Sequence, residues 1–209
     1  MARVNMVQAI DQALQQEMEQ DETVIVLGED VGKDGGVFRV TEGLVERFGE
    51  NRVIDTPLAE SAILGFSIGA AIAGYRPVAE MQFSGFSYPA FDQMISHAGR
   101  MRKRSQGTWT VPLVMRTPYG GGIRALEHHS ESMEAIWAHI PGIKTVIPSD
   151  PYDAKGLLTA AIRDPDPVVF YEPKRIYRAI KMEVPEEPYD IPLGKAKIVR
   201  EGTDATLIA

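Results

Sequence analysis

The spacing of apolar and polar positions alternates along the chain between a helical period and short unbroken apolar runs. From Met6 to Met18 an apolar residue recurs at every fourth position, which predicts an amphipathic helix with Asn5 as its cap. The apolar runs suit strands that are buried on both faces, and we predict them at residues 24–28, 52–56, 77–83, 111–116, 144–148 and 168–172. Helical stretches are predicted between them, at residues 61–74, 89–104, 131–140 and 152–163.

This alternation predicts an α/β fold, with a mostly parallel sheet flanked by helices on both faces. Ligands of such sheets bind at the carboxyl ends of the strands, so the loops there are the places to search for chemistry. We expect one domain over residues 1–182, followed by an extended linker over 183–194 that is rich in proline and acidic residues. Residues 195–209 contain two strand-like runs, at 195–199 and 205–209, and we expect them to open a second, truncated domain.

Composition narrows the class of protein. The net charge of −7 argues against binding to a nucleic-acid backbone. The absence of cysteine excludes a disulfide scaffold, a thiolate nucleophile and a cysteine-ligated metal. No apolar run approaches the ~20 residues that cross a bilayer, and the first residues resemble neither a signal nor a transit peptide. We therefore expect a cytoplasmic protein with no membrane contact.

A carboxyl group and a face of small residues share one predicted helix. Gly65, Gly69 and Ala73 stand four residues apart, so one face of the helix is almost bare backbone and predicts a close helix contact, inside the domain or between subunits. Glu60 begins this helix among apolar neighbours, which would raise its pKa and let it hold a proton near neutral pH. The alternative is that Glu60 only complements the helix dipole.

Two loops carry further candidates. Residues 28–36 form an acidic, glycine-rich loop that either positions a carboxylate, binds a metal or is only a turn; it lacks the Gly-Lys-Ser/Thr ending of a phosphate loop. Residues 116–130 contain three glycines followed by His128 and His129. These histidines are either a catalytic imidazole and its neighbour or a pair on a mobile surface loop.

Four segments resemble one enzyme family. Residues 27–32, 55–60, 150–158 and 161–164 are similar to the beta subunit of the thiamine-diphosphate-dependent 2-oxo acid dehydrogenases. These are the decarboxylating components of the pyruvate and branched-chain 2-oxo acid dehydrogenase complexes. The resemblance implies a transketolase-like pyrimidine-binding domain, then the opening strands of a transketolase C-terminal domain. It also implies a heterotetramer of two alpha and two beta subunits that acylates the lipoyl domain of a dihydrolipoamide acyltransferase core.

The resemblance also assigns residues to roles. Glu60 would hydrogen-bond the aminopyrimidine of the cofactor, with Phe86, Gln82 and Leu58 around it. Glu29 would relay protons between active sites, and His129 rather than His128 would serve acyl transfer. A potassium site is implied at Leu113, Ala161, Ile162, Asp164 and Asp166, although Asp166 replaces a common asparagine.

One check comes from a missing motif. Thiamine enzymes hold magnesium and the diphosphate with Gly-Asp-Gly and a later asparagine, whereas this chain lacks Gly-Asp-Gly and has only Asn5 and Asn51. We therefore expect the alpha subunit to hold the magnesium. Pyruvate is the foremost substrate and a branched-chain 2-oxo acid the next. The alternatives are an acetoin dehydrogenase beta subunit, or a non-catalytic Rossmann-like regulatory subunit in which Glu60 and His129 only cap helices.

Overall fold

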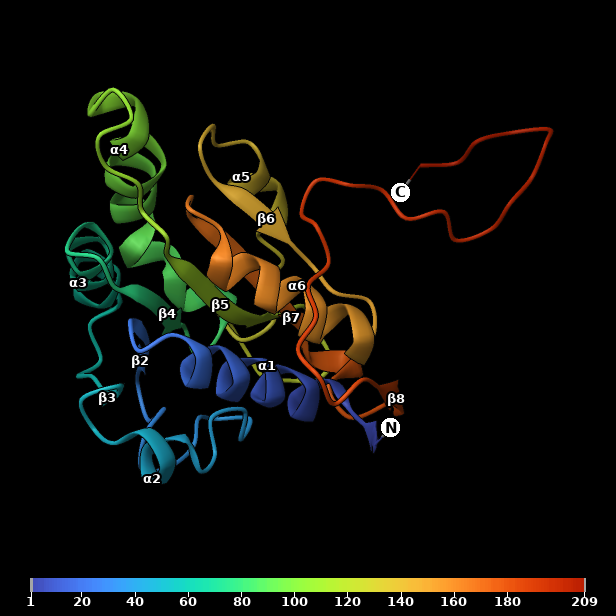
Figure 1. The fold of residues 1–209 in the computed structure, drawn as a ribbon, viewed down its shortest axis with the longest axis horizontal. Helices are drawn as coiled ribbons and strands as arrows, with labels where there is room; N and C mark the ends of the chain where they lie inside the picture. The colour runs from blue at the N-terminus through green and yellow to red at the C-terminus, as the bar shows by residue number, and fades with distance from the viewer. Residues whose placement is uncertain (1, 209) are drawn as a thin grey trace.

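A computed structural model describes residues 2–208, and its centre is a six-stranded sheet in which all neighbouring strands run parallel (Figure 1). The strand order is β3-β2-β4-β5-β7-β6. The strands are β2 (Val24–Gly28), β3 (Val53–Asp55), β4 (Arg76–Glu80), β5 (Val114–Tyr119), β6 (Lys144–Val146) and β7 (Val168–Pro173). The predicted α/β class and parallel sheet are confirmed.

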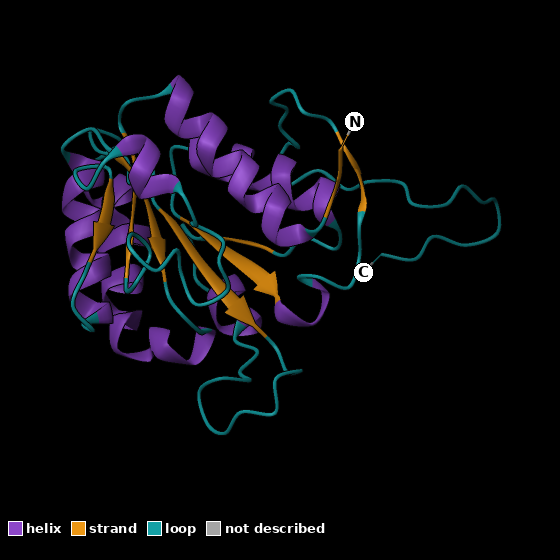
Figure 2. Ribbon diagram, turned by 90° about the horizontal axis from the view of Figure 1, so that it is seen from below, coloured by secondary structure: helices purple, strands orange, loops and turns teal. Residues whose placement is uncertain are grey.

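Helices cover both faces of the sheet (Figure 2). On one face lie α1 (Met6–Gln20) and α6 (Pro151–Arg163); on the other lie α3 (Glu60–Ile72), α4 (Gly99–Arg104) and α5 (Glu134–Ala138). The remaining helical segments are α2 (Leu44–Phe48), the 3-10 helices η1 (Ser84–Ala90) and η3 (Lys174–Ile176), and the π-helix η2 (Gln93–Ala98). Within residues 2–208, no helix is long and apolar enough to cross a membrane.

The alternation of side chains along β2 explains the two cores. Val24 and Val26 face the core under α1 and α6, whereas Ile25 and Leu27 face the core under α3. The predicted cap Asn5 is confirmed, and Asp150 caps α6 in the same way. Asn5 Oδ1 accepts the Gln8 backbone N–H at 3.0 Å, and Asp150 Oδ1 accepts that of Asp153 at 2.8 Å.

The stretch expected over residues 89–104 is helical throughout, but its winding changes from the 3-10 turns of η1 to the π-turns of η2 and the α-turns of α4. Two other predicted boundaries are wrong. The strand expected at 111–116 lies instead at 114–119, where it pairs with β7. The helix expected over 131–140 is limited to the five residues of α5.

The segment expected to be a linker is packed on the domain. Its first residues belong to β8 (Met182–Val184), which pairs antiparallel with β1 (Ala2–Val4). Beyond β8, the buried Lys155 Nζ donates to the carbonyl of Pro185 at 2.6 Å. The hydroxyl of Tyr189 donates to the Tyr152 carbonyl at 2.8 Å. The Ile191 N–H also donates to the Gly156 carbonyl at 3.0 Å, and Leu193 packs against the core under α1 and α6. These contacts hold residues 185–193 on the domain, and the chain that follows extends away from it (Figure 1).

The two strands expected near the end of the chain are not formed. Residues 195–208 contain no strand and are almost entirely exposed, and Ala209 lies outside the described residues. A strand needs a hydrogen-bonded neighbouring strand, and between residues 2 and 208 this segment joins neither sheet; its Lys197 forms only an ion pair with Asp153 at 3.7 Å. The assignment of residues 195–209 to a second domain therefore stays a prediction.

Candidate functional site

The order of the strands places a crevice at the carboxyl ends of β2 and β4. From β2 the chain first adds β3 on one side and then returns to add β4 on the other, so the connections diverge at this point. A topological switch of this kind is where open parallel sheets bind ligands. Three loops meet at this edge: residues 29–43 after β2, 56–59 after β3 and 81–83 after β4.

Two candidate carboxyl groups lie close together at this crevice. Burial raises the pKa of Glu29, and the nearby carboxylates of Glu60 and Asp30 raise it further. Glu60 is the first residue of α3 and is half-buried. Within residues 2–208 its carboxyl group accepts no hydrogen bond and forms no ion pair, so it is free to bond a ligand. The structure thus brings Glu29 and Glu60, which follow neighbouring strands, within electrostatic reach of each other.

The acidic loop after β2 wraps around Asp55. The backbone N–H groups of Gly32 and Lys33 donate to the Asp55 carboxylate at 2.6 and 3.2 Å. Gln82 Nε2 donates to Asp30 Oδ2 at 3.0 Å and so ties the loop to the end of β4. The loop therefore positions carboxylates, and no group of three or more His, Asp and Glu residues that could hold a metal occurs between residues 2 and 208.

The two adjacent histidines have different surroundings. The ring of His129 lies 4.5 Å from that of Phe83 and 5.0 Å from that of Phe86, whereas His128 is exposed. His129 Nδ1 lies 2.8 Å from the carbonyl oxygen of Glu127, an arrangement in which Nδ1–H donates. That tautomer leaves the lone pair of Nε2 free to accept a proton.

The four residues expected to contact a cofactor lie at the same edge. Phe86 is half-buried in η1, which packs against α3, and Glu60 begins that helix. Leu58 is 77% exposed in the loop between β3 and α3. A free carboxyl, an aromatic face and an exposed leucine fit an aromatic base such as an aminopyrimidine. Gln82 Nε2 already donates to Asp30, so this hydrogen bond occupies the amide of Gln82 in the structure.

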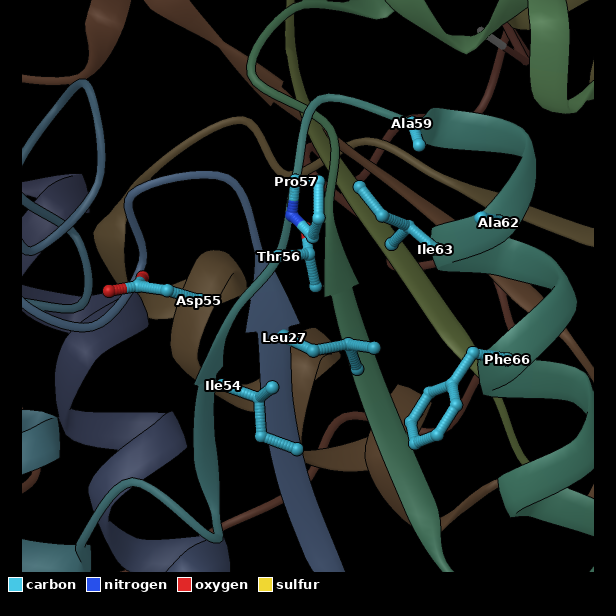
Figure 3. Close-up of a pocket in the computed structure, with 9 residues that line it drawn as sticks. All are labelled: Leu27, Ile54, Asp55, Thr56, Pro57, Ala59, Ala62, Ile63 and Phe66. Atoms are coloured by element: carbon cyan, nitrogen blue, oxygen red, sulfur yellow. The ribbon is translucent and has the colours of Figure 1, made fainter.

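Beside Glu60 lies an apolar pocket of about 280 Å³ (Figure 3). Ala59, Ala62 and Phe66 of the α3 region line one wall, and the carboxylate of Asp55 points away from the pocket (Figure 3). Phe66 is 57% exposed, and a Cβ on Gly69 would meet nothing within 4 Å. Of the two alternatives for the small-residue face, packing inside the domain is thus wrong for Gly69, because this part of the face lies open.

The residues expected to bind potassium are engaged by the protein itself. Lys144 Nζ lies 2.7 Å from both carboxylate oxygens of Asp164, and Arg102 Nε donates to Asp166 Oδ1 at 2.7 Å. The other three residues accept hydrogen bonds at their main-chain carbonyls: Leu113, Ala161 and Ile162. Cationic side chains hold both carboxylates, whereas the resemblance implies a potassium site made mainly of main-chain carbonyls, so the site stays a prediction. The potassium prediction rests on the resemblance alone, and we derive no step from it.

A buried charged network near the crevice was missed by the sequence reasoning. Arg116 of β5 bonds Glu80 at the end of β4 and, through two nitrogens at 2.7 and 2.9 Å, Glu172 of β7. The hydroxyl of Tyr177 donates to Glu172. Burial raises the pKa of Glu80 despite the guanidinium beside it. A charged residue in each of three adjacent apolar strands is the signal that indicates such a network.

Comparison with known proteins places the chain among described families. The model of the family described as "Transketolase, pyrimidine binding domain" matches residues 2–180. The chain is 61% identical over 209 residues to the pyruvate dehydrogenase E1 component subunit beta of Acholeplasma laidlawii. It is 58% identical over 208 residues to the 2-oxoisovalerate dehydrogenase subunit beta of Bacillus subtilis. Both matches cover 100% of this chain and 64% of the relative, so the chain spans about two thirds of these relatives.

A solved structure shares the fold at low sequence identity. The structure described as "Split gene transketolase, inactive beta4 tetramer" aligns with a TM-score of 0.65 and 17% identity. The alignment covers 81% of this chain and 51% of that one. At this identity the likeness shows the fold alone.

Proposed function

The chain belongs to the transketolase pyrimidine-binding domain family, and we propose on that premise that it is the beta-subunit part of a thiamine-diphosphate-dependent 2-oxo acid dehydrogenase. The observation that carries the proposal is the free, half-buried carboxyl of Glu60 beside Glu29 at the switch point of the sheet. The names of relatives at 61% and 58% identity support the same class of reaction. The alpha subunit would supply the magnesium and the diphosphate site.

The proposed overall reaction transfers the acyl group of a 2-oxo acid to a lipoyl group. A 2-oxo acid anion, a lipoyl disulfide and one proton give carbon dioxide and an S-acyl dihydrolipoyl group. The acyl carbon loses two electrons and the disulfide gains them; one sulfur forms the thioester and the other takes the proton. Thiamine diphosphate, when bound, supplies the carbon nucleophile that adds to the 2-oxo group and accepts the electron pair left by carbon dioxide.

This chain's residues would bind and move protons. Glu60 would hold a proton at the pyrimidine ring nitrogen, a task that suits a carboxyl group with no protein partner within residues 2–208. Phe86 would pack on the ring, and Glu29, whose pKa is raised by burial, would exchange protons with Glu60. The free Nε2 of His129 would carry a proton to or from the reacting groups.

Titration calorimetry tests the split site. The chain alone should show little magnesium-dependent affinity for thiamine diphosphate, and the mixture with the cognate alpha subunit should bind it tightly. The mixture should then turn over a 2-oxo acid. Tight, stoichiometric, magnesium-dependent binding of thiamine diphosphate by this chain alone would overturn the split-site proposal. If the alpha–beta mixture shows no thiamine-dependent turnover, the result favours the alternative of a non-catalytic regulatory subunit.

A substrate panel decides the remaining alternatives. The relatives named above include one pyruvate and one 2-oxoisovalerate dehydrogenase subunit at similar identity, so we propose pyruvate first and a branched-chain 2-oxo acid second. Rates with pyruvate, branched-chain 2-oxo acids and acetoin, measured with the cognate alpha subunit, separate these activities.

We expect Gly69→Leu to weaken assembly with the alpha subunit without unfolding the domain. Gly69 lies on the open face of α3, where a leucine meets nothing in this chain but would overfill a close contact with a partner, at a typical cost of ~1–3 kcal/mol. Gly69→Ala is the matched control, because it raises helix propensity by up to ~1 kcal/mol with little added bulk. Sedimentation and thermal unfolding of both variants check this; unimpaired assembly of the leucine variant would place the interface elsewhere.

We expect His129→Ala to impair turnover and lipoyl acylation far more than His128→Ala. His129 packs between Phe83 and Phe86, while His128 is exposed. Loss of a general acid or base typically costs ~10²–10⁴-fold in rate. Steady-state rates of the two variants with a lipoyl domain as acceptor check the difference. Equal effects would make the two histidines ordinary loop residues.

A further inference from the structure

Lys174 occupies an unusual place for a lysine. It begins η3, directly after β7, and its side chain is only 7% exposed. Burial lowers the pKa of its amine to about 8. The amine therefore still carries its charge at pH 7, in a place where a charge costs free energy unless it is bonded. A buried ammonium that is retained at this cost needs a partner.

The partner is the loop that carries His129. Lys174 Nζ donates to the main-chain carbonyl of His129 at 2.8 Å and lies 5.2 Å from the centre of the Phe83 ring. Within residues 2–208 the ammonium forms no ion pair, so this charge-assisted bond is its principal polar contact. Phe83 packs on the imidazole of His129 as well, so the lysine and the histidine share one aromatic neighbour.

The loop needs such a tether because its own conformation is unfavourable. Arg124 and His128 both have left-handed backbones, with φ of 54° and 68°, a region that residues other than glycine rarely adopt. The loop also contains three consecutive glycines, which add freedom. On its other side it is held by Ser84, whose hydroxyl donates to the Glu131 carbonyl at 2.9 Å, and by Gly85, where a Cβ would come within 2.6 Å of His128 Cα.

We propose that Lys174 is a positioning residue, which fixes the backbone of His129 so that its imidazole stays between Phe83 and Phe86. The inference rests on the proposed function for its effect on turnover, but not for its effect on the loop. Lys174 touches no reacting group in this account; it acts through His129. A misplacement of a reacting group by about 1 Å can cost ~10²-fold in rate.

Hydrogen exchange tests the tether without any assumption about the reaction. In the assembled alpha–beta enzyme, Lys174→Met should make amides of residues 120–133 exchange roughly 10- to 100-fold faster, the factor that corresponds to loss of one hydrogen bond to a charged group. Lys174→Arg keeps a charged donor and should restore slow exchange. Lys181→Met, which removes an exposed lysine seven positions later in the sequence, is the matched control and should change nothing. Unchanged exchange in Lys174→Met would overturn the proposal.

A double-mutant cycle tests the positioning role. Lys174→Met should lower lipoyl acylation by ~10²-fold when His129 is present and have almost no further effect in His129→Ala. Equal losses in both backgrounds would make Lys174 a merely structural residue. If the methionine variant fails to assemble, Lys174→Gln, which keeps only a weaker, uncharged N–H donor, is measured in the same cycle and should show a smaller loss that again disappears in His129→Ala. If the unchanged enzyme shows no turnover, the proposed function is contradicted. The hydrogen-exchange experiment would still test whether Lys174 holds the loop, because it does not depend on turnover.

Discussion

Glu60→Gln should lower the turnover of the alpha–beta enzyme by ~10²–10⁴-fold while the domain stays folded. The amide has nearly the shape of the carboxyl group, but it cannot hold and release a proton at the cofactor. Within residues 2–208 Glu60 forms no hydrogen bond or ion pair, so the substitution breaks none. Steady-state rates and thermal unfolding of the same preparation measure the two effects separately.

The control is Glu46→Gln, which changes an exposed glutamate in the first turn of α2. Both substitutions remove a negative charge near a helix N-terminus, a change worth typically ~0.3–1 kcal/mol of stability. Only Glu60→Gln should lower the rate. If both variants lose a little stability and keep full activity, Glu60 does no more than complement the dipole of α3.

Arg116→Met should lower the free energy of unfolding by about 3–5 kcal/mol, a large share of the 5–15 kcal/mol typical of a folded domain. The substitution leaves the buried carboxyls of Glu80 and Glu172 without the cation that bonds both of them. Urea unfolding measures the loss. Arg102→Met is the control, because its ion pair with Asp166 is exposed and should contribute no more than about 1 kcal/mol.

The loss of stability in Arg116→Met should grow as the pH rises. The pKa of Glu80 is already raised by burial, and without Arg116 it should rise further. Above the ordinary pKa of a glutamate, the unfolded chain releases this proton and the folded variant keeps it, so stability falls with increasing pH until the folded pKa is reached. The urea concentration at which Arg116→Met unfolds should therefore lie further below that of the parent protein at pH 8 than at pH 5. A difference from the parent protein that is the same at both pH values would contradict this explanation.

The sheet could be predicted because local sequence determines it. Val24–Gly28 is apolar at every position except its final glycine, and a short run of this kind fits only a strand covered on both faces. The caps Asn5 and Asp150 were equally predictable, since each bonds a backbone N–H only three residues away. The rule that parallel strands present their carboxyl ends at one edge also places the loops of Glu29 and Glu60 at the same edge of the sheet.

What could not be predicted depends on contacts between distant residues. Arg116 is 36 residues from Glu80 and 56 from Glu172, and no local pattern pairs them. The bond from Lys174 to the His129 carbonyl likewise spans 45 residues. The start of β5 at Val114 is set by its register with Val168 of β7, which the apolar run from Val111 does not reveal. The roles proposed for Glu29, Glu60 and His129 stay predictions.

The pairing of β1 with β8 has a consequence for how this domain is made in the cell. Its two strands stand at opposite ends of the domain, with Ala2 opposite Val184, and α1 packs against α6 more than a hundred residues later. A ribosome adds roughly 5–20 residues per second, so the apolar face of α1 waits on the order of ten seconds for its partner. The nascent chain therefore presents an unpaired apolar helix during most of the synthesis of this domain.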